Sequence, residues 1–215
     1  MPERPDWYEV TQGSELLQGD LLRECPIPRV RGLEHWPLRE GHLLEVDIDR
    51  EDVVIVSQSC DLANDKIQDV VLAQVLDWAV ACRALIRQGN TFARSRNFRR
   101  ALVAGNIPSL SLLHKHERAP TLGWAIVDFH RLFVLPKPVV IAVAQAAGPR
   151  LRLRSPYREH LAQALARYFM RVGLPHEAQA FESEGEVEGG AHAPAPVPGG
   201  LVRPRQVCYR DSVIV

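Results

Sequence analysis

Short apolar runs separated by turn residues dominate the first half of the chain and predict β-strands. Residues 53–56 are four consecutive β-branched residues, typical of a buried strand, and residues 69–76 form a second apolar run after a polar turn. Residues 18–27 lead from a Gly-Asp turn through a short apolar segment to a proline, which predicts a further strand. The prolines and glycines of residues 28–45 predict a loop, and a short strand at Leu43–Ile48 stays open as an alternative at its end.

The spacing of the apolar positions becomes helical after the second run. Apolar residues recur at this spacing over residues 78–86, and a second, weaker helix is expected over 96–103, so that residues 77–104 form a helical insertion. A longer helix is expected over residues 156–172, where Ser155 is a suitable N-cap and one apolar stripe runs along the segment. We expect this amphipathic helix to pack on the strands and close the domain.

Three later segments predict strands, at residues 108–113, 123–135 and 150–154. The last alternates arginine and leucine, which predicts a half-exposed strand with a basic outer face. Residues 139–145 fit both a strand and the start of a helix. Acidic residues and then prolines and glycines fill residues 177–215, which predicts a flexible tail after one domain of residues 1–176.

The composition is that of a soluble globular protein, with 46% apolar residues, 24% charged residues and a formal net charge of zero. A neutral chain does not as a whole steer towards nucleic acid or membranes, so such a role needs a local charge asymmetry. The chain has neither a secretion signal nor an apolar run near the ~20 residues of a membrane helix, and its four cysteines lack zinc-site spacing. We therefore expect a cytoplasmic, bacterial protein with reduced thiols, no membrane partner, no metal and no cofactor.

The order of these segments resembles the small barrel of the MazF/PemK toxin family. The match rests on Gly19-Asp20-Leu21-Leu22, an irregular loop, Val53–Ser57 and Val70–Val75, and it covers about residues 18–76. More closely, the chain resembles uncharacterised bacterial proteins with a Ser-Gln-Ser-Cys-Asp-Leu strand end, here residues 57–62. The resemblance implies an α+β, β-dominated fold built on an SH3-like barrel, and a toxin–antitoxin or phage-defence setting.

MazF-like enzymes cleave RNA with an arginine just before the central strand and a threonine or serine after the next strand. Arg50 lies near the first of these positions, whereas the second falls at Leu76. A leucine side chain cannot hydrogen-bond a phosphate oxygen. The resemblance therefore implies a MazF-like module without mRNA-interferase activity.

The polar end of the central strand offers one candidate for catalysis. Ser57, Cys60 and Asp61 follow the strand directly, and Arg50 precedes it. A cysteine nucleophile needs a neighbouring base or positive charge, whereas the carboxylate of Asp61 disfavours the thiolate. The alternative is a small structural cysteine with Asp61 capping the turn.

Residues 83–118 offer a candidate for nucleic-acid binding. They hold eight arginine and lysine residues against one acidic residue, Glu117, so their net charge is +7. Arginines can follow a phosphate backbone, and Phe92 and Phe98 can stack on bases. The predicted contacts are Arg94, Arg96, Arg99, Arg100, Arg152 and Arg154. The alternative is a solvated helix face that balances the acidic residues of 34–52, or a homodimer made from the two.

His114 and His116 share a strand face, and His130 could join them as a metal ligand, but the spacing matches no known metal motif. Three functions therefore stay open, in this order. The first is a MazF-like module that binds nucleic acid or a protein partner, the second an enzyme that uses Cys60 and Asp61, and the third a structural adaptor that docks through its C-terminal segment.

Overall fold

The computed structural model describes residues 6–35, 37 and 43–170, and these have an α+β fold. Residues 6–29 and 48–170 belong to one compact unit, and the described residues between 30 and 47 belong to a second. The predicted tail, residues 177–215, lies outside the described residues, as do the last two residues of the helix expected over 156–172.

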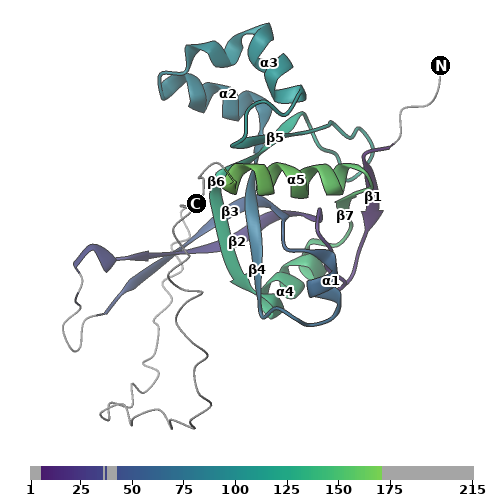
Figure 1. The fold of residues 1–215 in the computed structure, drawn as a ribbon. Helices are drawn as coiled ribbons and strands as arrows, with labels where there is room; N and C mark the ends of the chain where they lie inside the picture. The colour runs from purple at the N-terminus through teal and green to yellow at the C-terminus, as the bar shows by residue number, and fades with distance from the viewer. Residues whose placement is uncertain (1–5, 36, 38–42, 171–215) are drawn as a thin grey trace, which may run out of the picture. The chain divides into compact units, whose positions relative to one another are not determined.

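The larger of two sheets is five-stranded and antiparallel, in the order β2-β3-β4-β6-β5 (Figure 1). Its strands are β2 (Leu21–Arg31), β3 (Glu45–Ile55), β4 (Asp69–Asp77), β5 (Leu110–Leu113) and β6 (Ala125–Pro136). A second sheet pairs β1 (Tyr8–Thr11) with β7 (Arg150–Leu153). The strands expected over 53–56, 69–76, 108–113 and 123–135 are thereby confirmed within a few residues.

The two sheets meet at the predicted Gly-Asp turn. The amide of Gly19 donates to the carbonyl of Ile55 at 2.8 Å, and the amide of Leu153 donates to the carbonyl of Gly19 at 3.0 Å. Asp20 in turn bridges to Arg152 of β7. Despite these contacts, the strands of the described residues do not close into the expected barrel.

The loop expected over residues 28–45 is wrong at its start, because β2 continues to Arg31, whereas the short strand considered at Leu43–Ile48 is present as the beginning of β3, which starts at Glu45. β2 is an edge strand of the sheet, and an edge strand tolerates the missing N–H groups of Pro26 and Pro28. The acidic residues of β3 face arginines of β2 rather than those of residues 83–118. In the first unit Arg29 pairs with Asp49 at 2.8 Å.

Five α-helices lie between and after the strands: α1 (Ser59–Ala63), α2 (Trp78–Arg87), α3 (Arg96–Val103), α4 (Lys137–Ala147) and α5 (Tyr157–Phe169). Two 3-10 turns, η1 (Leu33–His35) and η2 (Thr91–Arg94), complete the described elements. Both helices of the insertion are confirmed, and both have side-chain caps: Asp77 accepts from the amides of Ala79 and Val80, and Ser95 accepts from Phe98. α5 begins after Pro156 without a side-chain cap, so the predicted role of Ser155 as N-cap is wrong.

The core of the sheet is buried on both faces. β3 ends in Val53, Val54 and Ile55, which are fully buried, so the expected central strand is confirmed. α5 packs over one face of the sheet and α4 over the other, whereas α2 and α3 lie together beside β5 and enclose a smaller cluster around Phe98 (Figure 1). No described helix is both long and apolar enough to cross a membrane.

The last strand departs most from its predicted pattern. All four residues of β7 are buried, including Arg150 and Arg152, so the half-exposed strand with a basic outer face is wrong. Both guanidinium groups bond to the carboxylate of Asp20, and Arg152 also reaches Glu15 at 2.9 Å. Buried charge is tolerated when it is paired and hydrogen-bonded, and alternation alone does not reveal such partners.

Candidate functional site

The polar side chains after β3 mostly form hydrogen bonds with backbone groups. The hydroxyl of Ser57 accepts from the amide of Val71 at 2.8 Å, and the hydroxyl of Ser59 accepts from the amide of Gln18 at 3.1 Å. Cys60 lies in the short helix α1 rather than in the expected turn. These bonds fix the end of β3 against β4 and the N-terminal segment.

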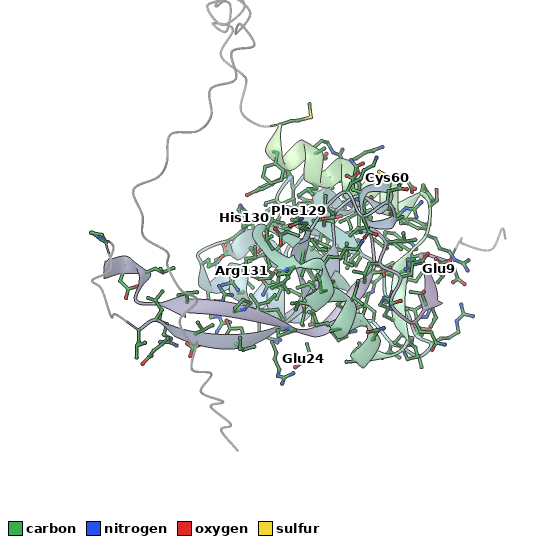
Figure 2. All side chains as sticks on the ribbon, turned by 90° about the horizontal axis from the view of Figure 1, so that it is seen from below. Glu9, Glu24, Cys60, Phe129, His130 and Arg131 are labelled. Atoms are coloured by element: carbon green, nitrogen blue, oxygen red, sulfur yellow. The ribbon has the colours of Figure 1, made fainter. Side chains whose placement is uncertain are left out.

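The thiol of Cys60 is exposed, and the groups near it are acceptors. Its Sγ lies 3.6 Å from Oε1 of Gln58 and 3.6 Å from Oδ1 of Asp61. Activation of a cysteine needs a base or a positive charge close to the sulfur, and no such group is among its described contacts. Figure 2 shows Cys60 well separated from His130 and Arg131. The arrangement fits a structural surface cysteine.

Arg50 does not join this group. It is exposed on β3, five residues before Ile55. At a rise of ~3.3 Å per residue, roughly 16 Å of strand separate it from the strand end. The four predicted catalytic residues, Ser57, Cys60, Asp61 and Arg50, therefore form no single site.

The predicted nucleic-acid contacts divide into two groups. Arg94, Arg96, Arg99 and Arg100 are exposed on η2 and α3, and none forms an ion pair with a described carboxylate. Arg154 is also on the surface, 3.9 Å from Glu9. Arg152 is buried and bonded to Asp20 and Glu15, so its expected contact with phosphate is wrong.

The aromatic residues near these arginines differ from the prediction too. Phe98 lies on the buried face of α3 and cannot stack on a base, whereas Phe92 is exposed. The exposed Trp124, which precedes β6, faces the edge of His114 with ring centres 4.4 Å apart. His114 stacks on Trp7 at 5.5 Å, and Trp7 stacks on Tyr157 at 4.0 Å.

These four rings, Trp124, His114, Trp7 and Tyr157, form what we call the aromatic row. They come from three distant parts of the chain, because Trp7 precedes β1, His114 and Trp124 both lie between β5 and β6, and Tyr157 begins α5, so no local pattern in the sequence groups them. The row is the main feature that the sequence does not reveal.

Three hollows border the aromatic row, and two of them contain arginines without a described carboxylate partner. The first, of about 300 Å³, is lined by Trp124, Arg99 and Val103. The second, of about 390 Å³, lies between the end of α3 and α5; Trp7, Tyr157 and Arg167 all line it. Both hollows are lined by Leu102 and Val103, so they lie next to each other at the end of α3.

The third hollow, of about 450 Å³, lies on the other side of Trp7 and Tyr157. Its positive groups are already paired: Lys115 with Glu117 at 2.5 Å, and Arg118 with Asp6 at 2.8 Å. The hydrogen bond and the charge of Lys115 lower the pKa of Glu117, which keeps that carboxylate ionised. Free positive charge therefore lies mainly in the first two hollows.

His114, His116 and His130 do not come together as the metal site considered from the sequence. His114 and His116 line the third hollow together, as expected from their spacing, but His130 bonds to Asp128 on β6 at 3.1 Å. Within residues 6–35, 37 and 43–170, no three His, Cys, Asp or Glu side chains are placed to hold a metal ion.

No protein-family model matches the chain, and no curated protein is significantly similar to it.

Proposed function

We propose that the protein binds single-stranded nucleic acid along the aromatic row, without cleaving it. The observation that carries the proposal is the row of contacting rings from Trp124 to Tyr157, bordered by hollows that contain Arg99 and Arg167. Aromatic faces stack on bases of any sequence, and arginines attract the phosphates between them. The exposed arginines of η2 and α3 extend this positive surface.

The proposal includes a MazF/PemK-like ancestry and a toxin or phage-defence setting. Its support is the resemblance over residues 18–76 and the contacts of the Gly19-Asp20 turn, which link β3 to β7 as a small barrel would need. Cleavage is not part of it, because Leu76 offers no hydroxyl and Cys60 has no base among its described contacts. The adaptor alternative depends on residues 177–215, which lie outside the described residues.

The test is fluorescence anisotropy with a labelled 12-nucleotide RNA in 50 mM and 200 mM salt, with RNA integrity scored on gels from the same samples. Each phosphate contact adds about −0.7 to the slope of log affinity against log salt for a single strand. We expect tight binding that weakens with salt, and RNA that stays intact. Absence of binding at both salt concentrations contradicts the proposal, and cleavage contradicts its second part.

One single and one double variant, with a matched double control, localise the binding. Trp124→Ala removes one stacking ring, worth about 1–3 kcal/mol, or about a 5- to 150-fold loss of affinity. Arg99→Ala with Arg100→Ala reduces both affinity and salt slope. The matched control is Arg23→Ala with Arg29→Ala, which removes the same charge from arginines already paired with Asp52 and Asp49. Equal losses in both arginine pairs would mean that only net charge matters.

A further inference from the structure

A cavity of about 290 Å³ between α2 and the sheet lies outside the site described above. Its floor is apolar and includes Leu76, Leu110 and Ile126, and the stripe of α2 from Val80 to Gln88 forms one wall. Gln74, Asp128 and Arg131 add polar groups from β4 and β6. An apolar cavity with a few converging polar groups is the usual form of a small-ligand site, and this volume is at the lower end of the range of about 300–1,000 Å³.

Gln74 is the unusual residue in this cavity, because it is 98% buried and its amide is only half satisfied. Its Nε2 donates to Oε2 of Glu51 at 2.6 Å, whereas its Oε1 has no hydrogen-bond partner in the described chain. Rotating the amide would break the bond to Glu51, so the orientation is fixed. A buried acceptor without a donor lowers stability, and a ligand N–H would restore that loss.

The backbone beside Gln74 is irregular as well. β4 pairs Ala73 with Leu132 but Gln74 with Asp128, so residues 129–131 leave the ladder as a bulge. Bulges often occur beside active sites, where they redirect side chains. Phe129 and His130 of this bulge contact Tyr168 of α5, with ring centres 6.0 and 5.6 Å apart, whereas Arg131 lines the cavity beside α2. Phe129 is buried in the core, whereas His130 and Arg131 are exposed.

Asp128 supplies a second acceptor at the cavity. Its Oδ1 accepts from the amide of His130 at 2.9 Å and lies 3.1 Å from Nδ1 of the same residue. No described donor bonds to its Oδ2. Gln74 and Asp128, each with one oxygen that has no described donor, thus line the cavity together with the donors of Arg131 and Gln88 at its exposed rim.

We propose that this cavity binds a single purine base, with guanine preferred. A purine is flat and apolar on its faces, which suits the floor and the α2 wall. Guanine carries two adjacent donors, N1–H and the N2 amino group, for the carboxylate and the amide oxygen, and an O6 acceptor for Arg131 or Gln88. Adenine lacks the N1 donor. Proteins that hold an unstacked base bind its Watson–Crick edge in this way.

The base can come from a free nucleotide or from an unpaired nucleotide of a bound strand. The second source rests on the nucleic-acid binding proposed above, and the first does not. Calorimetric titration with GMP and AMP tests the free source. Anisotropy with U12 and with the same RNA carrying one central guanine tests the chain-borne source.

We expect GMP to bind at least 10-fold more tightly than AMP, or the guanine-containing RNA to bind at least 10-fold more tightly than U12. Gln74→Met and Asp128→Asn should each reduce that preference by 10-fold or more. The matched control is Gln145→Met, an exposed glutamine of α4 outside the cavity, which should leave it unchanged. Thermal unfolding of every variant identifies a loss that is due to misfolding, and the two cavity variants provide independent tests.

Each outcome of these titrations either supports or contradicts guanine binding in the cavity. A guanine preference in either titration that the cavity variants abolish supports the proposal and identifies the source of the base. If neither titration distinguishes guanine, or Gln145→Met reduces the preference as much as Gln74→Met, the proposal is wrong. GMP binding without any RNA binding would sustain this cavity while contradicting the function proposed for the aromatic row.

Discussion

Asp20 and Arg150 lie 130 residues apart in the chain, yet their side chains form an ion pair with both groups almost completely buried. Nε of Arg150 donates to Oδ2 of Asp20 at 3.0 Å, and Arg152 bonds to the same carboxylate. Burial alone would lower the pKa of Arg152, but its hydrogen bonds to Asp20 and Glu15 raise it overall. One carboxylate thus joins the turn before β2 to β7.

Asp20→Asn should be strongly destabilising. The substitution leaves two buried guanidinium groups without their shared carboxylate, and breaking a buried pair from one side costs about 3–5 kcal/mol. The measurement is urea denaturation followed by tryptophan fluorescence. Asp49→Asn is the control, because Asp49 pairs with Arg29 on the surface, where such a pair contributes about 0–1 kcal/mol. Similar losses in both variants would contradict a structural role for the buried cluster.

Gly19→Ala should destabilise the protein more than Gly13→Ala, although both glycines have positive φ, +90° and +88°. Either substitution costs about 1 kcal/mol for the left-handed backbone. A Cβ at Gly19 would also lie 2.8 Å from Cβ of Leu153, whereas one at Gly13 meets nothing within 4 Å. Overpacking of this kind costs about 1–3 kcal/mol. Comparing the two unfolding free energies isolates the steric part, and equal values would mean that β7 can move away.

The stability of the protein should fall between about pH 9 and pH 11 because of Cys25. Burial raises the pKa of this thiol from 9.0 to about 11 in the folded protein. Because the folded-state pKa lies above the unfolded value, the buried neutral thiol contributes its full stabilisation below pH 9. This stabilisation is lost as the pH rises through 11. Two pKa units correspond to about 2.7 kcal/mol at most.

Denaturant midpoints measured at intervals of half a pH unit test this. In Cys25→Ala the decline over the same range should be shallower, whatever the variant's stability at pH 7. Burial also raises the pKa of Tyr8, but that phenol titrates at higher pH and is present in both proteins, so it cancels in the comparison. Parallel declines in the two proteins would assign the alkaline loss to other groups.

The sequence correctly predicted the elements that depend on neighbouring residues. It failed where contacts between distant residues determine burial or pairing. The β-branched run at Val53–Val56 and the capped helix α3 are governed by nearby residues, and the structure confirms both. The burial of Arg150 depends on Asp20, which is distant in the chain, so alternation gave the wrong exposure. The aromatic row and the half-satisfied Gln74 are likewise products of tertiary contacts, visible only once the strands are paired.

Alkylation of the native protein tests the alternative in which Cys60 is catalytic. Cys60 is exposed, Cys82 is partly buried and Cys25 is buried, so iodoacetamide at pH 7 should label them in that order, and Cys25 only after unfolding. The contacts of Cys60 are acceptors, which do not favour a thiolate. Its rate should therefore not exceed that of a cysteine in a short unfolded peptide. Peptide mapping by mass spectrometry separates these sites from Cys208, which lies outside the described residues.

Cys60→Ala should in addition leave RNA binding unchanged, because the thiol is not among the groups that line the hollows beside the aromatic row. A labelling rate more than about 10-fold above the peptide value would require a base or cation near the sulfur that the described contacts do not include. Loss of RNA binding in a folded Cys60→Ala variant would place the thiol in the binding surface. Either result would make the end of β3, rather than the aromatic row, the candidate functional site.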